Sequence, residues 1–446
     1  MKLRFLTLAP ALALLCGPAD AADAPSPPAL PVVTAPALSL RAALQIAAQN
    51  SVPLKQAGTD AAAAAAAASS ANAATKPGLS TTTYATTGDS SNTFSTSPGV
   101  DPRNVIRIPP RPFADQNLML EVPLLTGGRL SNNAAAAQTQ GDAARLTLQA
   151  SRLTVTEAVT EAYADAALQA ALVAVASARL SAEDEQVRIT QEKVRTGRLA
   201  PVDLLREQAE EADAGESRLA AGNSALLSLV RLKTVLGVSQ ASVFTLSDSL
   251  DALTPAGQPL PATLPDALRL AAARRPELAA ALKQVDAAES RVRAARAAYA
   301  PQVYGVAMAD ASAGAGVGRN GYTVGLTASL PLYDGGQRRA DVDAAKARVE
   351  RAKADAQQAE QQVEEDTASA WLMEQTAAAQ VPVTAAGVAA AQEGYALAAL
   401  RYNAGKSTTA ERLDALAALV RAQGAFAQAR ADVVSSRARL RAAVGS

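Results

Sequence analysis

The sequence predicts a mainly α-helical fold with a smaller share of membrane β-structure, built from one unit duplicated in tandem. Residues 122–129 return as 330–337, and residues 195–198 return as 403–406, both at an offset of 208 residues. Hydrophobic residues make up 49% of the chain but aromatic residues only 3%, because alanine carries the apolar fraction. Alanine favours helices that approach each other closely. A constant offset over more than a hundred residues indicates a structural repeat.

The two halves are expected to share one order of elements: helix, strand, loop, strand and two long helices. Helices end at Pro77-Gly78 and break at Gly197 and Gly405, and the Thr-rich run that follows Gly78 favours a strand. In the first half we expect helix over 38–76 with an interruption near Pro53, strand over 79–87, loop over 88–112, strand over 117–125, and helix over 127–195 and 201–236. In the second half we expect helix over 265–298, a strand after Pro301, loop over 314–321, strand over 322–332, and helix over 336–403 and on to 443.

The organisation along the chain follows from these elements. Lys2 and Arg4 precede a short apolar stretch and small residues, the pattern of a secretory signal peptide. The single cysteine, Cys16, would leave with it, although Leu14-Leu15-Cys16 also resembles a lipidation box. We expect a signal peptide over 1–21, a Pro-rich extension over 22–37, a first repeat over 38–237, a linker over 238–264 and a second repeat over 265–445. The loop over 88–112 is 16 residues longer than its counterpart, which predicts a solvent-facing tip.

The strands and the long helices carry different patterns. Over 322–332, apolar residues alternate with small or polar ones, and 11 residues match the length of a tilted transmembrane strand. An ordinary half-buried strand in a soluble sheet explains that alternation equally well. The helices instead repeat every seven residues, at Val342, Val349, Ala356, Val363 and Ala370, with counterparts Ala134, Gly141, Leu148, Val155 and Ala162. A seven-residue spacing predicts a coiled-coil-like seam, which is also common in purely structural coiled coils.

Four strands per chain cannot close a barrel, and open strand edges are costly in lipid because unpaired backbone groups lack partners there. Strands in a membrane would therefore require several chains to share one barrel. Two chains would give eight strands, whose interior side chains fill, whereas three would give twelve strands and a lumen. A channel thus favours a trimer or a larger ring, with the helices continuing the barrel as a tube.

The composition argues against several functional classes. The net charge is zero, so we expect no nucleic-acid partner. The chain has no histidine and no cysteine beyond Cys16, which leaves neither a His- or Cys-based metal site nor the common catalytic triads. The Gly127-Gly128 and Gly335-Gly336 pairs lack the lysine of a phosphate loop and fit tight strand-to-helix turns. We expect neither an enzyme nor a bound cofactor.

The chain resembles the TolC-like outer-membrane efflux family over about residues 38–445. The matching motifs are Leu-Pro-Leu-Tyr-Asp-Gly-Gly-Gln at 330–337, Arg-Tyr-Asn-Ala-Gly at 401–405 with Leu413-Asp414-Ala415 after it, and the first-half copy from Gly197 to Leu205. The resemblance implies a homotrimer with a twelve-stranded barrel in the lipid of a Gram-negative outer membrane. It also implies a helical barrel in the periplasm, with an adaptor protein and an inner-membrane pump as partners.

The resemblance also implies roles for residues near the two helix breaks. Glu411 and Asp414 match the family's acidic aperture positions, where a ring of six carboxylates in a trimer would favour cations and could bind divalent metal. Asp203 and Tyr402 match positions that link neighbouring helices at the tip, and Gly197 and Gly405 would make the tip turns. This chain has Ser407 where the best-known members carry arginine, so a complete Asp–Tyr–Arg link does not carry over.

Three functions fit these observations to different degrees. The leading one is the exit duct of a tripartite efflux pump for drugs, toxic compounds or metals. The duct of a type I protein secretion system would look the same in sequence, because the pump selects the cargo. A periplasmic coiled coil without a pore is the third reading, against which the alternating strand argues.

Overall fold

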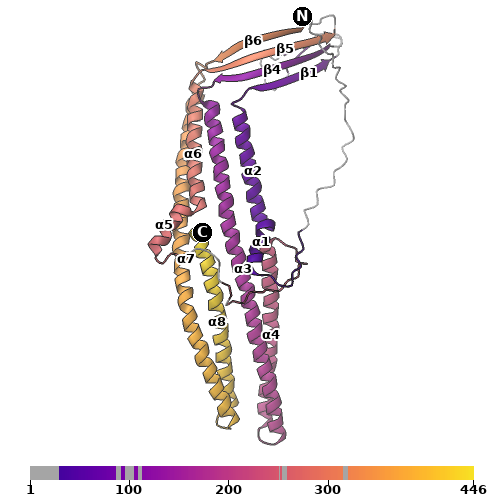
Figure 1. Ribbon diagram of the computed structural model, residues 1–446, viewed down its shortest axis with the longest axis vertical. Helices are drawn as coiled ribbons and strands as arrows, with labels where there is room; N and C mark the ends of the chain where they lie inside the picture. The colour runs from indigo at the N-terminus through magenta and orange to yellow at the C-terminus, as the bar shows by residue number, and fades with distance from the viewer. Residues whose placement is uncertain are drawn as a thin grey trace.

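The computed structural model describes residues 30–86, 92–95, 105–108, 113–250, 252–253, 259–314 and 320–446. The predicted signal peptide, Cys16 and most of the Pro-rich extension lie outside the described residues, as does most of the 88–112 loop. Long helices run side by side to form a rod, and a β-sheet caps one end of it (Figure 1). The predicted fold class, long helices with four main strands, is confirmed.

The order of elements repeats once, as the sequence predicted. The helices are α1 (Leu40–Asn50), α2 (Val52–Ala73), α3 (Arg129–Arg195), α4 (Pro201–Leu236), α5 (Leu264–Arg274), α6 (Pro276–Arg296), α7 (Gln337–Asn403) and α8 (Thr409–Ala443). The strands are β1 (Gly78–Thr86), β2 (Asn92–Ser95), β3 (Val105–Ile108), β4 (Phe113–Leu125), β5 (Gln302–Gly314) and β6 (Asn320–Ser329), with a short 3₁₀ turn at Ala297–Tyr299 before β5. At 67 residues each, α3 and α7 are about 100 Å long at 1.5 Å per residue.

Several predictions about element boundaries were wrong, and the strand expected over 117–125 begins already at Phe113. The helix expected over 265–298 is broken at Arg275, because Pro276 disfavours helical geometry in the residue before it. The strand expected over 322–332 ends at Ser329, just before the Leu330-Pro331 pair. The 88–112 segment contains a short antiparallel pair, β2 and β3, where a plain loop was expected.

The main sheet has the order β1-β4-β5-β6, and every neighbouring pair is antiparallel. The register places Leu120 between Leu79 and Ala307, so side chains of one parity share a face. That face carries exposed Leu79, Leu118, Leu120, Tyr322, Val324 and Leu326. The other face carries Asn117 and Asp310, whose side chains are hydrogen-bonded at 2.6 Å. One face of the sheet therefore suits lipid and the other suits water.

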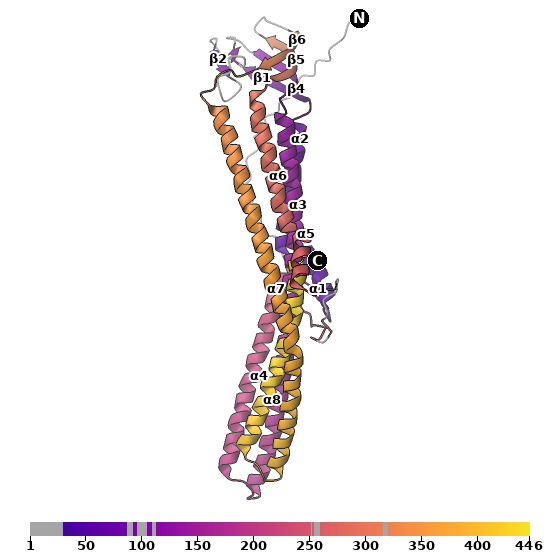
Figure 2. The same cartoon turned by 90° about the vertical axis from the view of Figure 1, so that its left-hand side faces the viewer.

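The helices form a single curved layer, and its composition changes halfway along the rod. Next to the sheet the order is α2, α3, α6, α7, and towards the far end it is α4, α3, α8, α7. Figures 1 and 2 show α3 and α7 running the full length while shorter helices fill the places between and beside them. The pairs α3/α4 and α7/α8 form two hairpins whose turns lie together at the end opposite the sheet.

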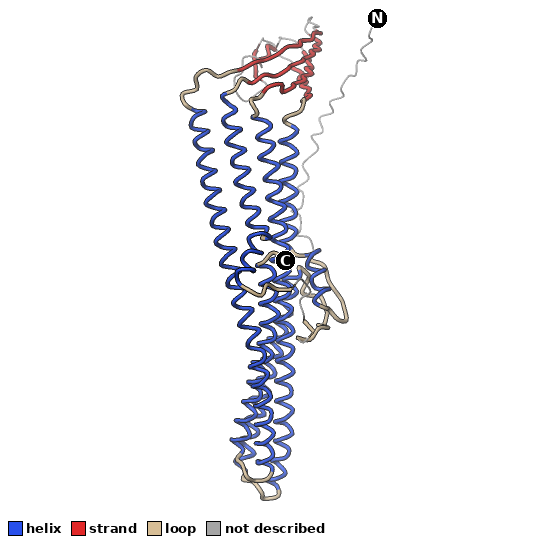
Figure 3. Tube along the Cα trace, turned by 60° about the vertical axis from the view of Figure 1, so that its left-hand side comes forward, coloured by secondary structure: helices blue, strands red, loops and turns tan. Residues whose placement is uncertain are grey.

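The main core lies at the middle of the rod, where residues 30–50, 238–250 and 252–253 pack against one side of the helices (Figure 3). Thr34 and Leu38 bridge to Val243 and Leu246 in a short parallel ladder. Tyr163 on α3 is fully buried beneath it, donates a hydrogen bond to the Leu38 carbonyl at 2.7 Å, and accepts one from the Asp248 amide at 3.3 Å. The helix α1 and this ladder connect α3 with α4 and with the segment that follows α4. They therefore hold the middle of the rod together.

The predicted seven-residue seam is confirmed in the second repeat and altered in the first. All five seam residues of α7 are buried. On α3, Gly141 and Val155 are buried, whereas Ala134, Leu148 and Ala162 are only half-buried. A second buried row on α3, Ala136, Ala143 and Ala150, lies two positions along. The helix α3 packs against α2 and α6 in this region, while α7 packs against α6 and, near Ala370, against α5.

Two helices, α3 and α4, contain a window long and apolar enough to cross a membrane by length and composition alone. This criterion is weak for a chain in which alanine carries the hydropathy, because alanine helices of soluble bundles also satisfy it. The exposed face of the sheet, with its continuous run of large apolar side chains, is the stronger candidate for lipid contact.

Candidate entrance at the helical tip

The two turns at the tip are built in the same way. Each helix ends in a glycine with left-handed backbone, Gly197 at φ 73° and Gly405 at φ 70°. The Gly197 amide donates to the Val194 carbonyl, and the next amide donates to the Lys193 carbonyl. The Gly405 turn repeats both bonds, which is the pattern of a Schellman motif and explains why glycine is needed there. A short link then leads into α4 or α8.

The acidic pair expected at the aperture lies on the first turns of α8. Thr408 caps this helix through a hydrogen bond from the Glu411 amide to its hydroxyl at 3.2 Å. The side chains of Glu411 and Asp414 are both exposed, and their i, i+3 spacing places them on one face of α8. The Ser407 hydroxyl donates to the Glu411 carboxylate. Both acids are thus accessible to solvent at the tip of the chain.

The pair expected to link the helices is not joined within one chain. The hydroxyl of Tyr402 is buried and has no hydrogen-bond partner among the described residues, so it does not bond to the half-buried Asp203. The ring of Tyr402 instead lies near two cations. Lys193 Nζ is 4.8 Å from the ring centroid, and the Arg412 guanidinium carbon is 5.7 Å from it. These contacts join α7 to α3 and α8 without Asp203.

The structure adds a buried ionic cluster that the sequence analysis missed. Arg412 Nη2 lies 2.6 Å from Glu207 Oε2 and 3.2 Å from Glu183 Oε2. All three residues are almost fully buried, at 2%, 0% and 1% exposure respectively. They come from α8, α4 and α3. The one available signal was divergence between the repeats, since the residues 208 positions away are Leu204, Ala415 and Ala391.

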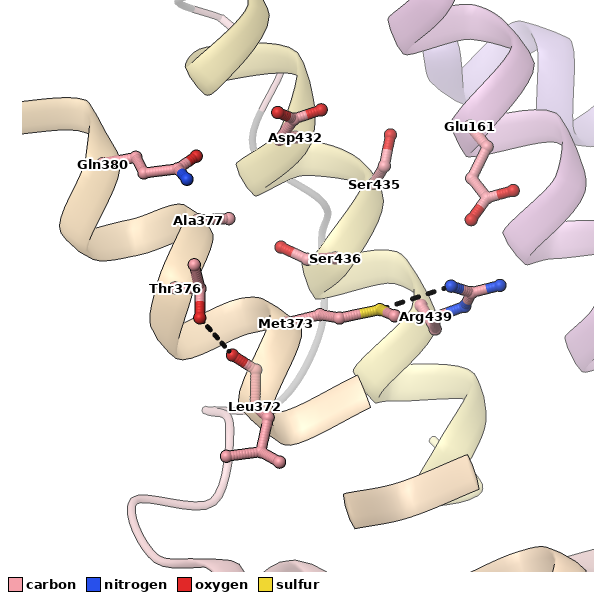
Figure 4. A pocket seen from close by; sticks show the side chains of 10 residues that line it. All are labelled: Glu161, Leu372, Met373, Thr376, Ala377, Gln380, Asp432, Ser435, Ser436 and Arg439. Carbon is pink, nitrogen blue, oxygen red and sulfur yellow. Dashed lines mark hydrogen bonds between the residues drawn. The ribbon is translucent and has the colours of Figure 1, made fainter. Parts of the chain in front are cut away.

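A second polar region lies at mid-rod, in an open groove of about 410 Å³ between α3, α7 and α8 (Figure 4). Arg439 Nη1 lies 3.4 Å from the sulfur of Met373, and its Nε lies 3.4 Å from Glu157 Oε1. Burial raises the pKa of Glu157, and the nearby Glu161 carboxylate adds to this effect. Among the described residues, no three His, Cys, Asp or Glu side chains come together as a metal-ligand set.

Among the described residues, every layer has an unpartnered edge on the same two sides. The sheet ends in β1 and β6, the upper helical layer in α2 and α7, and the lower layer in α4 and α7. The lower edges carry exposed large apolar side chains, on α4 Leu205, Leu219, Leu226, Leu227 and Val230, and on α7 Leu372, Val383, Leu397 and Leu400. An exposed apolar stripe on a long helix is costly in water and is typical of a protein–protein contact.

The comparisons with known proteins agree with this architecture. A family model described as outer membrane efflux protein matches residues 43–238 and again residues 267–446. The chain belongs to the outer membrane efflux protein family. It is therefore an efflux protein of the outer membrane that extends into the periplasm, and the double match is the tandem repeat seen in the sequence.

This efflux protein is similar to individual relatives and to solved structures. It is 28% identical over 324 residues to the outer membrane efflux protein BepC of Brucella suis, which covers 71% of this chain and 69% of BepC. It is 32% identical over 189 residues to the nickel-cobalt-cadmium resistance protein NccC of Alcaligenes xylosoxydans, covering 41% of this chain and 38% of NccC. Among solved structures, the open state of the MtrE outer membrane channel of Neisseria gonorrhoeae shares its fold, with a TM-score of 0.73, 21% identity, and coverage of 91% and 89%.

Proposed function

We propose that three copies of this efflux protein form a ring that is the exit duct of a tripartite pump for small molecules, including metal ions. The observation that carries the proposal is the set of matching open edges in the sheet and in both helical layers. A ring satisfies the backbone groups of β1 and β6 and covers the apolar stripes of α4 and α7 at the same time. A single copy leaves all of them unsatisfied.

Three copies, and not two, fit a duct. Each chain supplies four main strands, so three supply twelve and two supply eight. Side chains fill the interior of an eight-stranded barrel, whereas a twelve-stranded one retains a lumen. The polar face of the sheet, with its Asn117–Asp310 pair, would line that lumen, and its apolar face would contact lipid. The helical layers would extend the tube into the periplasm towards an adaptor protein and an inner-membrane pump.

Metal ions are included among the cargoes because NccC is named as a nickel-cobalt-cadmium resistance protein. The tip is where a cation would first meet the duct. Glu411 and Asp414 are exposed at the start of α8, and three chains would bring six carboxylates around the entrance. A ring of carboxylates favours cations over anions and binds divalent ions in preference to monovalent ones.

Conductance across planar bilayers tests this function. The wild-type protein should form cation-selective channels that divalent ions block. Glu411→Ala/Asp414→Ala should raise the conductance and weaken the block, because the charges that bind the blocking ion are gone. Asp355→Ala, which removes an exposed acid far up α7, is the matched control and should change neither property. Absence of any conductance from wild-type protein would contradict the duct, and unchanged block in the double variant would remove these acids from the aperture.

The predicted roles of Asp203 and Tyr402 are tested in the same assay. The Tyr402 hydroxyl has no partner within one chain, so a tip link through it would need a rearranged or neighbouring Asp203. If that link forms in the ring, Tyr402→Phe should make the closed channel leakier, because a hydrogen bond is worth about 0.5–1.5 kcal/mol net. Equal leakage of Tyr402→Phe and wild type would show that Tyr402 acts only through its ring.

A further inference from the structure

The cluster of Glu183, Glu207 and Arg412 is the one place in the lower rod where a buried ion pair joins the two hairpins among the described residues. Arg412 begins the return helix of the second hairpin, and the two glutamates face each other across the first. Any movement that separates the hairpins must pull Arg412 from both acids. The cluster is therefore positioned to hold the tip in one arrangement.

The charges of this cluster do not balance if all three groups are ionised. A guanidinium stays protonated in proteins, so two carboxylates would leave one negative charge in excess. Two carboxylate oxygens and one guanidinium nitrogen, Glu183 Oε1, Glu207 Oε1 and Arg412 Nε, are also buried without hydrogen-bond partners among the described residues. An unpaired charge in such a site is unfavourable, and a proton is the smallest ligand that removes it.

Among the described residues, no cation besides Arg412 forms an ion pair with either buried glutamate. On α3, Arg179 lies one turn from Glu183 but pairs with Glu210 and Asp213 of α4, at 3.5 and 2.6 Å. Lys193, also on α3, lies over the Tyr402 ring. On α4 the next group is Glu210, whose charge opposes ionisation of Glu207. On α7, Tyr402 and Tyr395 face Arg412 and are neutral when protonated.

We propose that Glu207 holds a proton beside Glu183 and Arg412, and that this protonated cluster latches the α3/α4 hairpin to α8 and holds the tip closed. The proposal rests on the duct function and adds to it a titratable latch made of residues other than the predicted tip link. Losing the proton would leave a buried negative charge between the hairpins and weaken their contact.

The direction of the pH effect follows from the raised pKa of Glu207. Burial raises this pKa above its ordinary value of 4.5; Arg412 opposes the rise, and Glu183 and Glu210 add to it. A group whose pKa is higher in the folded state stabilises that state at low pH and loses this contribution as the pH rises through the folded value. The latch should thus be tightest in acid and loosen with rising pH.

Cysteine accessibility tests the latch without requiring a working channel. Ala214 is fully buried on α4 and seven residues from Glu207, so Ala214→Cys reports separation of the helices near the cluster. The rate of its reaction with a small thiol reagent should rise with pH in the purified protein, beyond the rise of the free thiolate. The expected rise is about tenfold for each pH unit by which the pKa of Glu207 in the closed tip exceeds its ordinary value.

In the Ala214→Cys protein, the further change Glu207→Gln removes the excess charge. The reaction rate should then stay low and should rise with pH only as the free thiolate does. Glu216→Gln, which makes the same change at an exposed site on α4, should keep the wild-type pH dependence. Equal pH dependence of Glu207→Gln and Glu216→Gln would overturn the latch. Bilayer conductance of the same proteins separates the two proposals: channels with no pH-dependent labelling contradict the latch alone, and labelling without channels contradicts the duct alone.

Discussion

The helices α3 and α7 are copies of one sequence unit with the same length, yet they occupy different places in the layer. In the upper rod α3 lies between α2 and α6 and buries two rows of small residues. There α7 lies at an edge and buries mainly the row that begins at Val342, with Ala345 and Thr367 beside it. The interior copy thus buries small residues on two sides, whereas the seven-residue row is buried without gaps only in the edge copy. The edge copy, α7, has one side that contacts no other helix among the described residues, as expected for a chain that is one segment of a ring.

The same contrast holds at matched single positions. Tyr163 is fully buried and makes two hydrogen bonds, while its counterpart Trp371 is half-buried with its indole nitrogen unpaired among the described residues. A Cβ on Gly127 would lie 2.3 Å from the Ala300 Cβ, whereas one on Gly335 would meet nothing within 4 Å. The two copies keep the same backbone arrangement, but their different surroundings determine which side chains each position can accept.

The largest expected effect is at Arg412, which has Leu204 as its counterpart. Arg412→Leu would leave Glu183 and Glu207 buried without their cation, and breaking a buried pair in this way costs about 3–5 kcal/mol. Urea unfolding in detergent would measure the loss. The combined variant Arg412→Leu/Glu183→Gln/Glu207→Gln removes the stranded charges and should recover most of it. A similar loss in both variants would show that packing, not charge, dominates at this site.

A smaller difference is expected between the two strand-to-helix glycines. Both have left-handed backbone, at φ 56° for Gly127 and φ 64° for Gly335. Alanine in that conformation costs about 1–2 kcal/mol at either position, and the clash with Ala300 adds about 1–3 kcal/mol at Gly127 only. Thermal unfolding should rank wild type, Gly335→Ala and Gly127→Ala in order of falling stability. Equal losses would mean that the β4–α3 junction relaxes freely.

The smallest effect is expected at the mid-rod core. Tyr163→Phe removes the hydroxyl that bonds to Leu38 and Asp248, which should lower the free energy of unfolding by about 0.5–1.5 kcal/mol. The loss is larger if no water replaces the hydroxyl at the Leu38 carbonyl. Trp371→Phe removes an indole nitrogen that has no hydrogen-bond partner among the described residues. Losing this polar group should therefore reduce the stability less than losing the Tyr163 hydroxyl. Hydrogen exchange of the Asp248 amide should speed up in Tyr163→Phe. An unchanged exchange rate would show that the ladder between Thr34 and Val243 is stable without the Tyr163 hydroxyl.

The sequence was sufficient for the parts of the fold that repeat. The offset of 208 residues located both hairpins, and the breaks at Gly197 and Gly405 follow from a backbone geometry that only glycine adopts readily. The seam of α7 was also predictable, because its five buried residues follow one seven-residue period along the helix. The break at Arg275 was missed although Pro276 signals it, since the alanines on both sides continued the helical pattern.

The parts that were not predictable depend on contacts between distant segments. Arg412 looks like one more charged residue on a polar helix, and only the packing of α8 against α3 and α4 makes it buried. The two rows on α3 arise because helices from both repeats cover it, which no local pattern records. The tip residues Glu411, Asp414, Asp203 and Tyr402 came from family resemblance, and their roles in the aperture stay predictions.

The central claim is that this chain is one third of a ring, and native mass spectrometry in mild detergent tests it most directly. The account predicts a single species with three times the mass of the mature chain, because the edges at β1 and β6 and at α4 and α7 need a partner on both sides. Leu400→Asn, which weakens the α7 stripe, should shift part of the population to smaller species. A wild-type monomer that keeps its β-sheet and helices in that detergent would contradict the account.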